Sequence, residues 1–173
     1  GVVATEGDVK EIRRLEAVTE RYLDLARRRA PVLSPENPAE IARSVVALED
    51  ERLRRLGVEA RVEASRSRVV DIDGNLLRRA LLNLVRNAAE AGAQQVVVQV
   101  DVGDVLQVSV TDDGPGMSPE VAARIFEPFF STKGRGTGLG LALTRQGIED
   151  LGGTVGVESH EGAGATFTLR VPI

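Results

Sequence analysis

Two pairs of strand-like segments, each joined by a short turn that contains glycine, constrain the fold of this chain most. QVVVQVDV (95–102) and VLQVSVT (105–111) flank Gly103 and Asp104, and TVGVES and TFTLRV flank HEGAGA near the end. Strands joined by such turns pair antiparallel. Because segments with helical periodicity separate the pairs, we expect an α+β fold. It would be a two-layer sandwich of a mixed, mostly antiparallel sheet with helices on one face.

The remaining elements follow from apolar spacing and from proline and glycine. Asp73 is expected to cap the central helix. Three prolines in PVLSPENP (31–38) interrupt the pattern, so we place a boundary between one unit at 1–30 and a second at 31–173. The spacing predicts two strands around a short turn, at 59–64 and 67–72, and helices at 7–30, 38–56, 75–91, 118–124 and 139–151.

The composition excludes several classes of function. The 173-residue chain has no cysteine, which rules out disulfides, thiolate metal sites and cysteine nucleophiles. A formal net charge of −4 argues against a nucleic-acid partner. The chain has no apolar run long enough for a membrane span, and GVVATEGD lacks the features of a signal peptide. We expect a cytoplasmic location, whether or not a parent protein carries a membrane anchor.

Two asparagines mark the predicted helix at 75–91. Asn83 and Asn87 lie four residues apart, so their side chains lie one above the other on the helix surface. Asparagine disfavours helix interiors because its side chain competes for the backbone. An amide oxygen is a hard ligand that suits Mg²⁺ shared with substrate phosphates. The pair is therefore either a ligand site or two solvated amides.

The segment VTDDGPGM (110–117) follows a predicted strand. The ionised carboxylate of Asp112 or Asp113 only accepts hydrogen bonds, so it could receive one from an amino group such as that of adenine. Gly114 and Gly116 would let the backbone approach a flat ligand. The same residues also form ordinary turns readily.

The segment RIFEPFFSTKGRGTGLGL (124–141) combines aromatic, basic and glycine residues. Phe126, Phe129 and Phe130 could anchor a lid or simply pack in the core. Lys133 and Arg135 would face anionic phosphates. Gly138, Leu139 and Gly140 would offer backbone N–H groups at a helix start. A flexible loop with a helix cap is the alternative.

Taken together, these motifs resemble a known family. N-x-x-x-N-A, D-x-G-x-G, F-x-P-F and G-T-G-L-G-L occur in the order found in the catalytic ATP-binding domain of bacterial sensor histidine kinases. That domain belongs to the ATPase superfamily that includes the B subunit of DNA gyrase. LLNLVRNAAEA and FSTKGRGTGLGLAL are most similar to the nitrogen-regulator class. The resemblance covers about residues 31–173 and implies a Bergerat-type fold with an ATP lid.

The resemblance also implies site residues and cofactors, namely ATP and Mg²⁺. Asn87 would bind the metal, Asp112 would accept from the adenine amino group, and Gly114 and Gly116 would shape the adenine pocket. Lid and phosphate contacts would come from Phe129, Lys133, Arg135, Gly136, Thr137, Gly138, Leu139 and Gly140.

Two positions depart from the family. Hydrolysing members of the superfamily carry a glutamate, which acts as general base, at the position of Asn83. We still expect Asn83 to lie at the ATP site. Asn83 cannot abstract a proton, so it fits a kinase with slow attack by water, because phosphoryl transfer rests mostly on positioning. Many sensor kinases carry a basic residue three positions after the metal-binding asparagine, where this chain has Glu90.

The helix at 7–30 resembles the second helix of the dimerisation and phosphotransfer domain of these kinases. The helix with the phosphoacceptor histidine is absent, and the only histidine, His160, falls in a glycine-rich turn. We therefore expect no catalytic residue in this chain and no autophosphorylation. The expected partners are ATP or ADP, a phosphoacceptor helix, a response regulator and, in the full-length kinase, a second copy. A serine kinase of the superfamily and a nucleotide-free scaffold remain alternatives.

Overall fold

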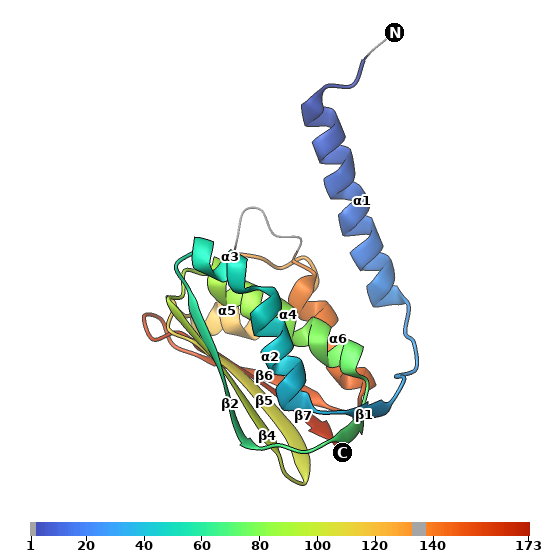
Figure 1. Cartoon of the computed structure of the whole chain (residues 1–173). Coiled ribbons are helices and arrows are strands. Elements are labelled where there is room, and N and C mark those ends of the chain that lie inside the picture. Colours follow the sequence, from blue (N-terminus) through green and yellow to red (C-terminus); the bar gives the residue numbers. More distant parts are fainter. Residues whose placement is uncertain (1–2, 133–137) are drawn as a thin grey trace.

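The computed structural model describes residues 3–132 and 138–173 (Figure 1). The helices are α1 (Glu6–Ala26), α2 (Pro38–Leu48), α3 (Asp50–Arg55), α4 (Gly74–Glu90), α5 (Pro119–Arg124) and α6 (Gly140–Asp150). The strands are β1 (Ser34–Glu36), β2 (Glu59–Arg66), β3 (Val70–Ile72), β4 (Gln95–Val102), β5 (Val105–Asp112), β6 (Thr154–Ser159) and β7 (Ala165–Pro172).

Five strands form one mixed sheet in the order β2-β4-β5-β7-β6, and β1 and β3 form a separate antiparallel pair. Strands β2 and β4 run parallel, and the other neighbours of the large sheet run antiparallel. Helices α2, α4 and α6 lie side by side over one face of the large sheet (Figure 1). The α+β two-layer class and both predicted hairpins are therefore confirmed.

The core lies between this helical layer and the sheet. Strand β4 alternates buried and more exposed residues, so Val96, Val98, Val100 and Val102 face the helices. Its polar residues and Val97 face the other way. Helix α4 starts as predicted, because the Asp73 side chain accepts hydrogen bonds from the N–H groups of Asn75 and Leu76. The largest fully buried side chains include Ile72, Leu77, Leu81, Leu84, Leu106, Leu139, Ile148 and Leu169.

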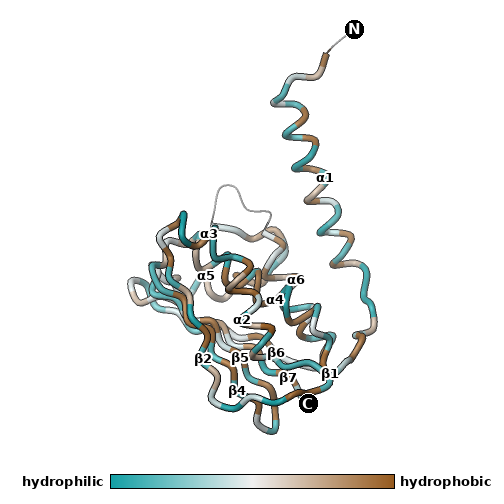
Figure 2. The backbone as a smooth tube through the Cα atoms, in the orientation of Figure 1, coloured by the Kyte–Doolittle hydropathy of each residue, from teal (hydrophilic) through white to brown (hydrophobic). Residues whose placement is uncertain are grey.

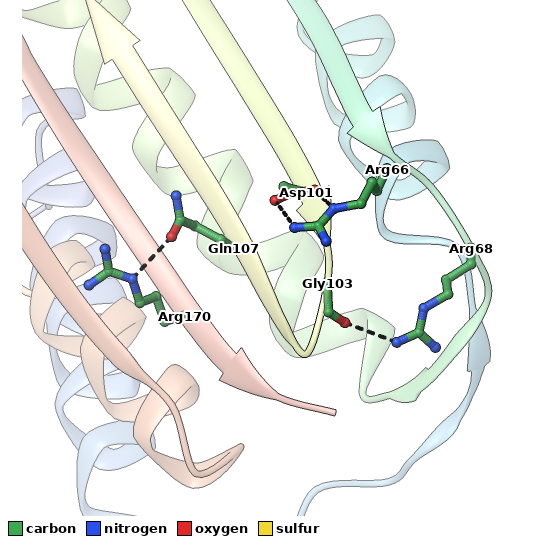
Figure 3. Close-up of polar contacts among 6 residues, drawn as sticks. All are labelled: Arg66, Arg68, Asp101, Gly103, Gln107 and Arg170. Carbon is green, nitrogen blue, oxygen red and sulfur yellow. Dashed lines mark hydrogen bonds and ion pairs between the residues drawn. The ribbon is translucent and has the colours of Figure 1, made fainter.

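The opposite face of the sheet is polar (Figure 3). The Arg66 guanidinium on β2 donates two hydrogen bonds of 2.6 Å to the Asp101 carboxylate on β4. This ion pair lowers the pKa of Asp101. Nearby, Arg170 donates to the Gln107 side chain at 3.1 Å, and Arg68 donates to the Gly103 carbonyl at 3.0 Å. These contacts link neighbouring strands through solvated side chains, whereas the helical face links them through apolar packing.

Two parts of the sequence-based assignment are wrong. The predicted helix at 38–56 divides into α2 and α3 at Glu49, whose backbone leaves the helical conformation while its carboxylate is buried against Arg86. The strands predicted at 59–64 and 67–72 do not pair with each other. Strand β2 joins β4, and β3 joins β1, a strand within the proline-rich stretch 31–38 for which we predicted no strand. These pairings depend on long-range packing.

Helix α1 extends away from the rest of the molecule (Figure 1). The side chains of Thr5 and Asp8 form a reciprocal capping box at its start. The helix ends at Ala26 and not at residue 30 as predicted, so the arginines at 27–29 lie beyond it. Apolar and polar segments alternate along it (Figure 2), and none of its 21 residues, all of which the structure describes, is buried.

Within the described ranges, the helices lack the combination of length and apolar character that a membrane span requires.

Candidate nucleotide site

The asparagine motif on α4 contacts the start of α6. Asn83 is half-buried, and its Nδ2 donates a hydrogen bond of 2.9 Å to Thr144 Oγ1. Thr144 Oγ1 in turn donates to the Gly140 carbonyl at 3.0 Å. A Cβ atom at Gly140 would lie 2.5 Å from Asn83 Oδ1, so a larger residue at this position would displace the Asn83 side chain. The first and last of the four sequence motifs therefore meet in space.

Asn87 lies one turn further along α4 and is also half-buried. The neighbouring Arg86 donates a 2.7 Å hydrogen bond to the buried Glu49 carboxylate, which raises the pKa of Arg86. Glu90, the position that departs from the family pattern, accepts a 2.7 Å hydrogen bond from Arg52. These two ion pairs fix the exposed side of α4 to the α2–α3 segment. Sequence reasoning missed both, because nothing in the local pattern pairs residues almost 40 positions apart.

The D-x-G-x-G loop begins at the end of β5. Asp112 is buried, with 9% of its surface exposed, and its Oδ1 accepts a 2.9 Å hydrogen bond from the Gly114 N–H. This bond fixes the orientation of the carboxylate. A buried carboxylate that is oriented by a backbone amide suits the predicted role as an acceptor.

Asp113 has a different task from Asp112. Its exposed carboxylate accepts hydrogen bonds of 2.8 and 2.9 Å from the N–H groups of Gln94 and Gln95. The Gln95 and Gln94 amides lower the pKa of Asp113. The side chain of Asp113 therefore connects the D-x-G-x-G loop to the segment that follows α4. Of the two adjacent aspartates, Asp112 is the buried acceptor and Asp113 holds the loop in place.

The F-x-P-F motif leads to the glycine-rich segment. Phe129 has a φ of 65° and donates a backbone hydrogen bond of 2.9 Å to the Gly138 carbonyl, so the F-x-P-F motif contacts the first described residue before α6. The Phe129 ring stacks on Tyr22 of α1, with the ring centroids 5.8 Å apart. Leu139 is fully buried beside the start of α6. The predictions for Lys133, Arg135, Gly136 and Thr137 lie outside the described residues.

The donor set fits a magnesium ion that is shared with a ligand. In the part of the chain that the structure describes, no cluster of three or more His, Cys, Asp and Glu side chains could hold a metal by itself. Mg²⁺ commonly takes one or two protein oxygens and completes its shell with water and substrate phosphates. A single amide oxygen from Asn87 is consistent with that pattern.

The described motifs, the mixed sheet and its helical layer define a nucleotide-binding class, and the comparison with known families agrees. Residues 72–173 match the family described as histidine kinase-, DNA gyrase B- and HSP90-like ATPase, and the chain belongs to it.

Its relatives are sensor histidine kinases. The sensor histidine kinase ZraS of Salmonella typhimurium is 34% identical over 169 residues, which cover 95% of this chain and 36% of the relative. Sporulation kinase E of Bacillus subtilis is 30% identical over 172 residues, covering 94% and 23%. The chain thus spans about a third or less of these curated relatives.

Solved structures give the same family. Full-length ShkA in complex with AMPPNP superimposes with a TM-score of 0.84 at 30% identity, covering 99% of this chain and 40% of ShkA. The nucleotide-free catalytic domain of the histidine kinase ThkA has a TM-score of 0.74 at 33% identity, covering 82% of this chain and 95% of that domain. The expected resemblance to the sensor histidine kinase ATP-binding domain is confirmed.

Proposed function

We propose that residues 31–173 bind ATP with Mg²⁺ and transfer its γ-phosphoryl group to a histidine on a dimerisation helix outside this chain. The phosphoryl group would then pass to an aspartate of a response regulator. One observation carries the proposal: the Asn83 amide lies against Gly140, which joins the asparagine motif to the glycine motif. The buried Asp112 carboxylate supplies the acceptor that the same proposal requires.

Each site residue has a role in this proposal. Asp112 accepts from the adenine amino group, in a pocket shaped by Gly114 and Gly116. The Asn87 amide oxygen holds Mg²⁺, which supplies charge stabilisation at the phosphates. Phosphate and lid contacts come from Phe129, Lys133, Arg135, Gly136, Thr137, Gly138, Leu139 and Gly140, the last of these through backbone N–H groups at the start of α6.

The transfer needs no general base from this chain. Asn83 donates its amide to Thr144 and carries no group that could activate water, so hydrolysis stays slow. Phosphoryl transfer depends mainly on positioning and on charge stabilisation, and the acceptor imidazole brings its own nucleophile. We infer a kinase domain that preserves bound ATP until a histidine reaches it, and that does not autophosphorylate by itself.

The first thirty residues are the second helix of a dimerisation domain in this proposal. The stripe of apolar residues on α1 supports it, because Ile12, Leu15 and Tyr22 are all exposed. A second copy of the kinase would cover them. The complex of ThkA with the response regulator TrrA, 27% identical with a TM-score of 0.79 and covering 95% of this chain and 49% of ThkA, supports a regulator as the downstream partner. We include a cytoplasmic location in the same proposal.

Calorimetry of Mg²⁺-ATP binding tests the nucleotide site. Asp112→Asn should weaken binding about 10- to 100-fold, because the adenine amino group loses a charged acceptor. Asn87→Ala should weaken binding only when Mg²⁺ is present. Asn75→Ala, which removes an exposed amide from the same helix, is the matched control and should bind as wild type does. Absence of ATP and ADP binding at about millimolar concentration would overturn the proposal in favour of a scaffold.

A second assay tests the acceptor. The chain is incubated with labelled ATP and a separate helical hairpin that carries the phosphoacceptor histidine. The expected product is a phosphoramidate, which acid hydrolyses. An acid-stable phosphoester on a partner protein would instead identify a serine kinase.

A further inference from the structure

We propose that Ser159 is a positioning residue for the nucleotide, and that it sets the preference for adenine over guanine. Through its hydroxyl group it would hold the D-x-G-x-G loop in the shape that presents the Asp112 carboxylate. The inference rests on the proposed role of Asp112 and adds a residue from β6 that belongs to none of the four motifs.

The Ser159 hydroxyl bridges two backbone segments. It accepts a hydrogen bond of 2.8 Å from the Met117 N–H, at the end of the D-x-G-x-G loop. It donates one of 2.8 Å to the Gly164 carbonyl, in the β6–β7 turn. A hydroxyl group can serve as donor and acceptor at once, so this half-buried side chain uses both capacities for the backbone.

The strand register places this bridge at the end of the ordered ladder. Asp112 pairs with Ala165 at the last position between β5 and β7, and Ser159 pairs with the same residue between β6 and β7. Asp112 and Ser159 therefore flank one residue of β7. Beyond this point the loop and the turn are joined by the Ser159 bridge and by a 2.6 Å hydrogen bond from the Gly162 N–H to the Pro115 carbonyl.

The two backbones touch directly. Gly116 and Gly164 have positive φ values of 69° and 76°. A Cβ atom on Gly116 would overlap the His160 carbonyl oxygen, and one on Gly164 would overlap the Asp112 carbonyl oxygen. Because this contact leaves no gap, a shift of the β6–β7 turn displaces the backbone of Asp112. The turn thus acts as the support against which the adenine-binding loop is shaped.

This geometry predicts an effect on base selectivity. A carboxylate accepts from the amino group of adenine, whereas guanine presents a carbonyl oxygen at that position and is repelled. Discrimination depends on the placement of the carboxylate, which the Gly114 N–H sets at 2.9 Å from Oδ1 within the same loop. Loosening the loop should therefore cost affinity for ATP more than affinity for GTP.

The test measures the dissociation constants of Mg²⁺-ATP and Mg²⁺-GTP for three variants, together with urea unfolding of each. Ser159→Ala should weaken ATP binding about 5- to 30-fold and lower the preference for ATP over GTP by a similar factor. Ser159→Thr keeps a hydroxyl group and should restore both values to within about threefold of wild type. Ser109→Ala is the matched control, because it removes a buried hydroxyl group from the polar face of the same sheet.

The outcomes separate a role of Ser159 in positioning the nucleotide from a role in stability alone. A lower unfolding midpoint of Ser159→Ala with unchanged ATP affinity and base preference would overturn the inference. If Ser159→Ala does not fold, Ser159→Cys, which keeps the size but only weak hydrogen bonding, takes its place in the same comparison. Failure of wild type to bind ATP contradicts the proposed function itself. Loss of binding in Asp112→Asn with wild-type behaviour of Ser159→Ala contradicts only the role of Ser159.

Discussion

Helices α1 and α4 carry similar amphipathic patterns, yet the molecule treats them differently. Helix α4 buries eight of its 17 residues between the sheet and its neighbouring helices. Helix α1 buries none of its 21 residues, all of them described. Its contacts with the rest of the chain include the stacked Tyr22 ring and packing against α6, and Arg28, just beyond its end, forms a 4.0 Å ion pair with Asp150. Their surroundings, and not their local sequences, set them apart.

The difference shows what an apolar stripe does and does not indicate. An apolar stripe indicates that one face of the helix packs against other protein, which can belong to the same chain or to another. The apolar stripe of α4 is buried within the domain. The same helix places Asn83 and Asn87 at the candidate site. The stripe of α1 fits an intermolecular helical bundle, as the proposed dimer requires.

Truncation of one leucine on each helix tests this contrast most strongly. Leu84→Ala in α4 should lower the free energy of unfolding by about 2–5 kcal/mol, because it opens a cavity in the core. Leu15→Ala in α1, where the side chain is 57% exposed, should change it by less than about 0.5 kcal/mol at low protein concentration. Urea denaturation measures both. Equal losses would show that α1 is as well packed as α4.

The ion pairs on the outer side of α4 give a smaller effect. Glu49→Ala should destabilise the domain by about 1–3 kcal/mol, because it leaves the Arg86 guanidinium, whose Nε is buried without a partner among the described residues, with less compensation. Glu90→Ala breaks a similar pair at about 40% exposure and should cost less than about 1 kcal/mol. A larger loss from Glu90→Ala, again by urea denaturation, would contradict this ranking.

Acid should separate the two regions as well. The pKa of Asp113 is lowered by the Gln95 and Gln94 amides, so its stabilising effect is complete above its unfolded pKa and disappears as pH falls through its lower folded pKa. The pKa of Asp8 is lowered by Thr5 in the α1 cap, with the same sign. Asp113→Asn should flatten the acid side of the stability curve of the domain below about pH 5.

Asp8→Asn should instead remove only the acid-dependent loss of α1 helicity, which circular dichroism measures. A shift of the domain midpoint by Asp8→Asn, or none by Asp113→Asn, would break the distinction between the two carboxylates.

The smallest expected effect is on the orientation of α1. Tyr22→Ala removes the ring contact with Phe129 and should leave the unfolding free energy unchanged within about 0.5 kcal/mol. It should broaden the distance distribution between spin labels at positions 13 and 120, which are unique because the chain has no cysteine. Ile12→Ala, also on the exposed stripe, is the control. An unchanged distribution in Tyr22→Ala would show that the ring contact does not orient the helix.

Local signals in the sequence predicted those elements whose causes are local. The Asp73 cap, the apolar face of α4 and both hairpin turns act within a few residues, and the structure confirms them. The break at Glu49 and the pairing of β1 with β3 arise from contacts between distant segments. No local pattern encodes the burial of the Glu49 carboxylate against Arg86.

The residues of the candidate site show the same contrast between local signals and long-range contacts. Asn83, Asp112 and Gly140 stand out because their residue types are unusual where they occur. Ser159 could not be found from the sequence, because a serine at a strand end is ordinary and its partner Met117 lies 42 residues away. Residues that support a site through backbone contacts become visible only once the fold is known.

The sparse attachment of α1 has a mechanical consequence. A helix of 21 residues is about 30 Å long, and Tyr22 lies within about 6 Å of its lower end. A rotation of about 10° around that end therefore moves Glu6 by about 5 Å but Tyr22 by only about 1 Å. Such a rotation would therefore reach the ring of Phe129 as a displacement about five times smaller than that at Glu6.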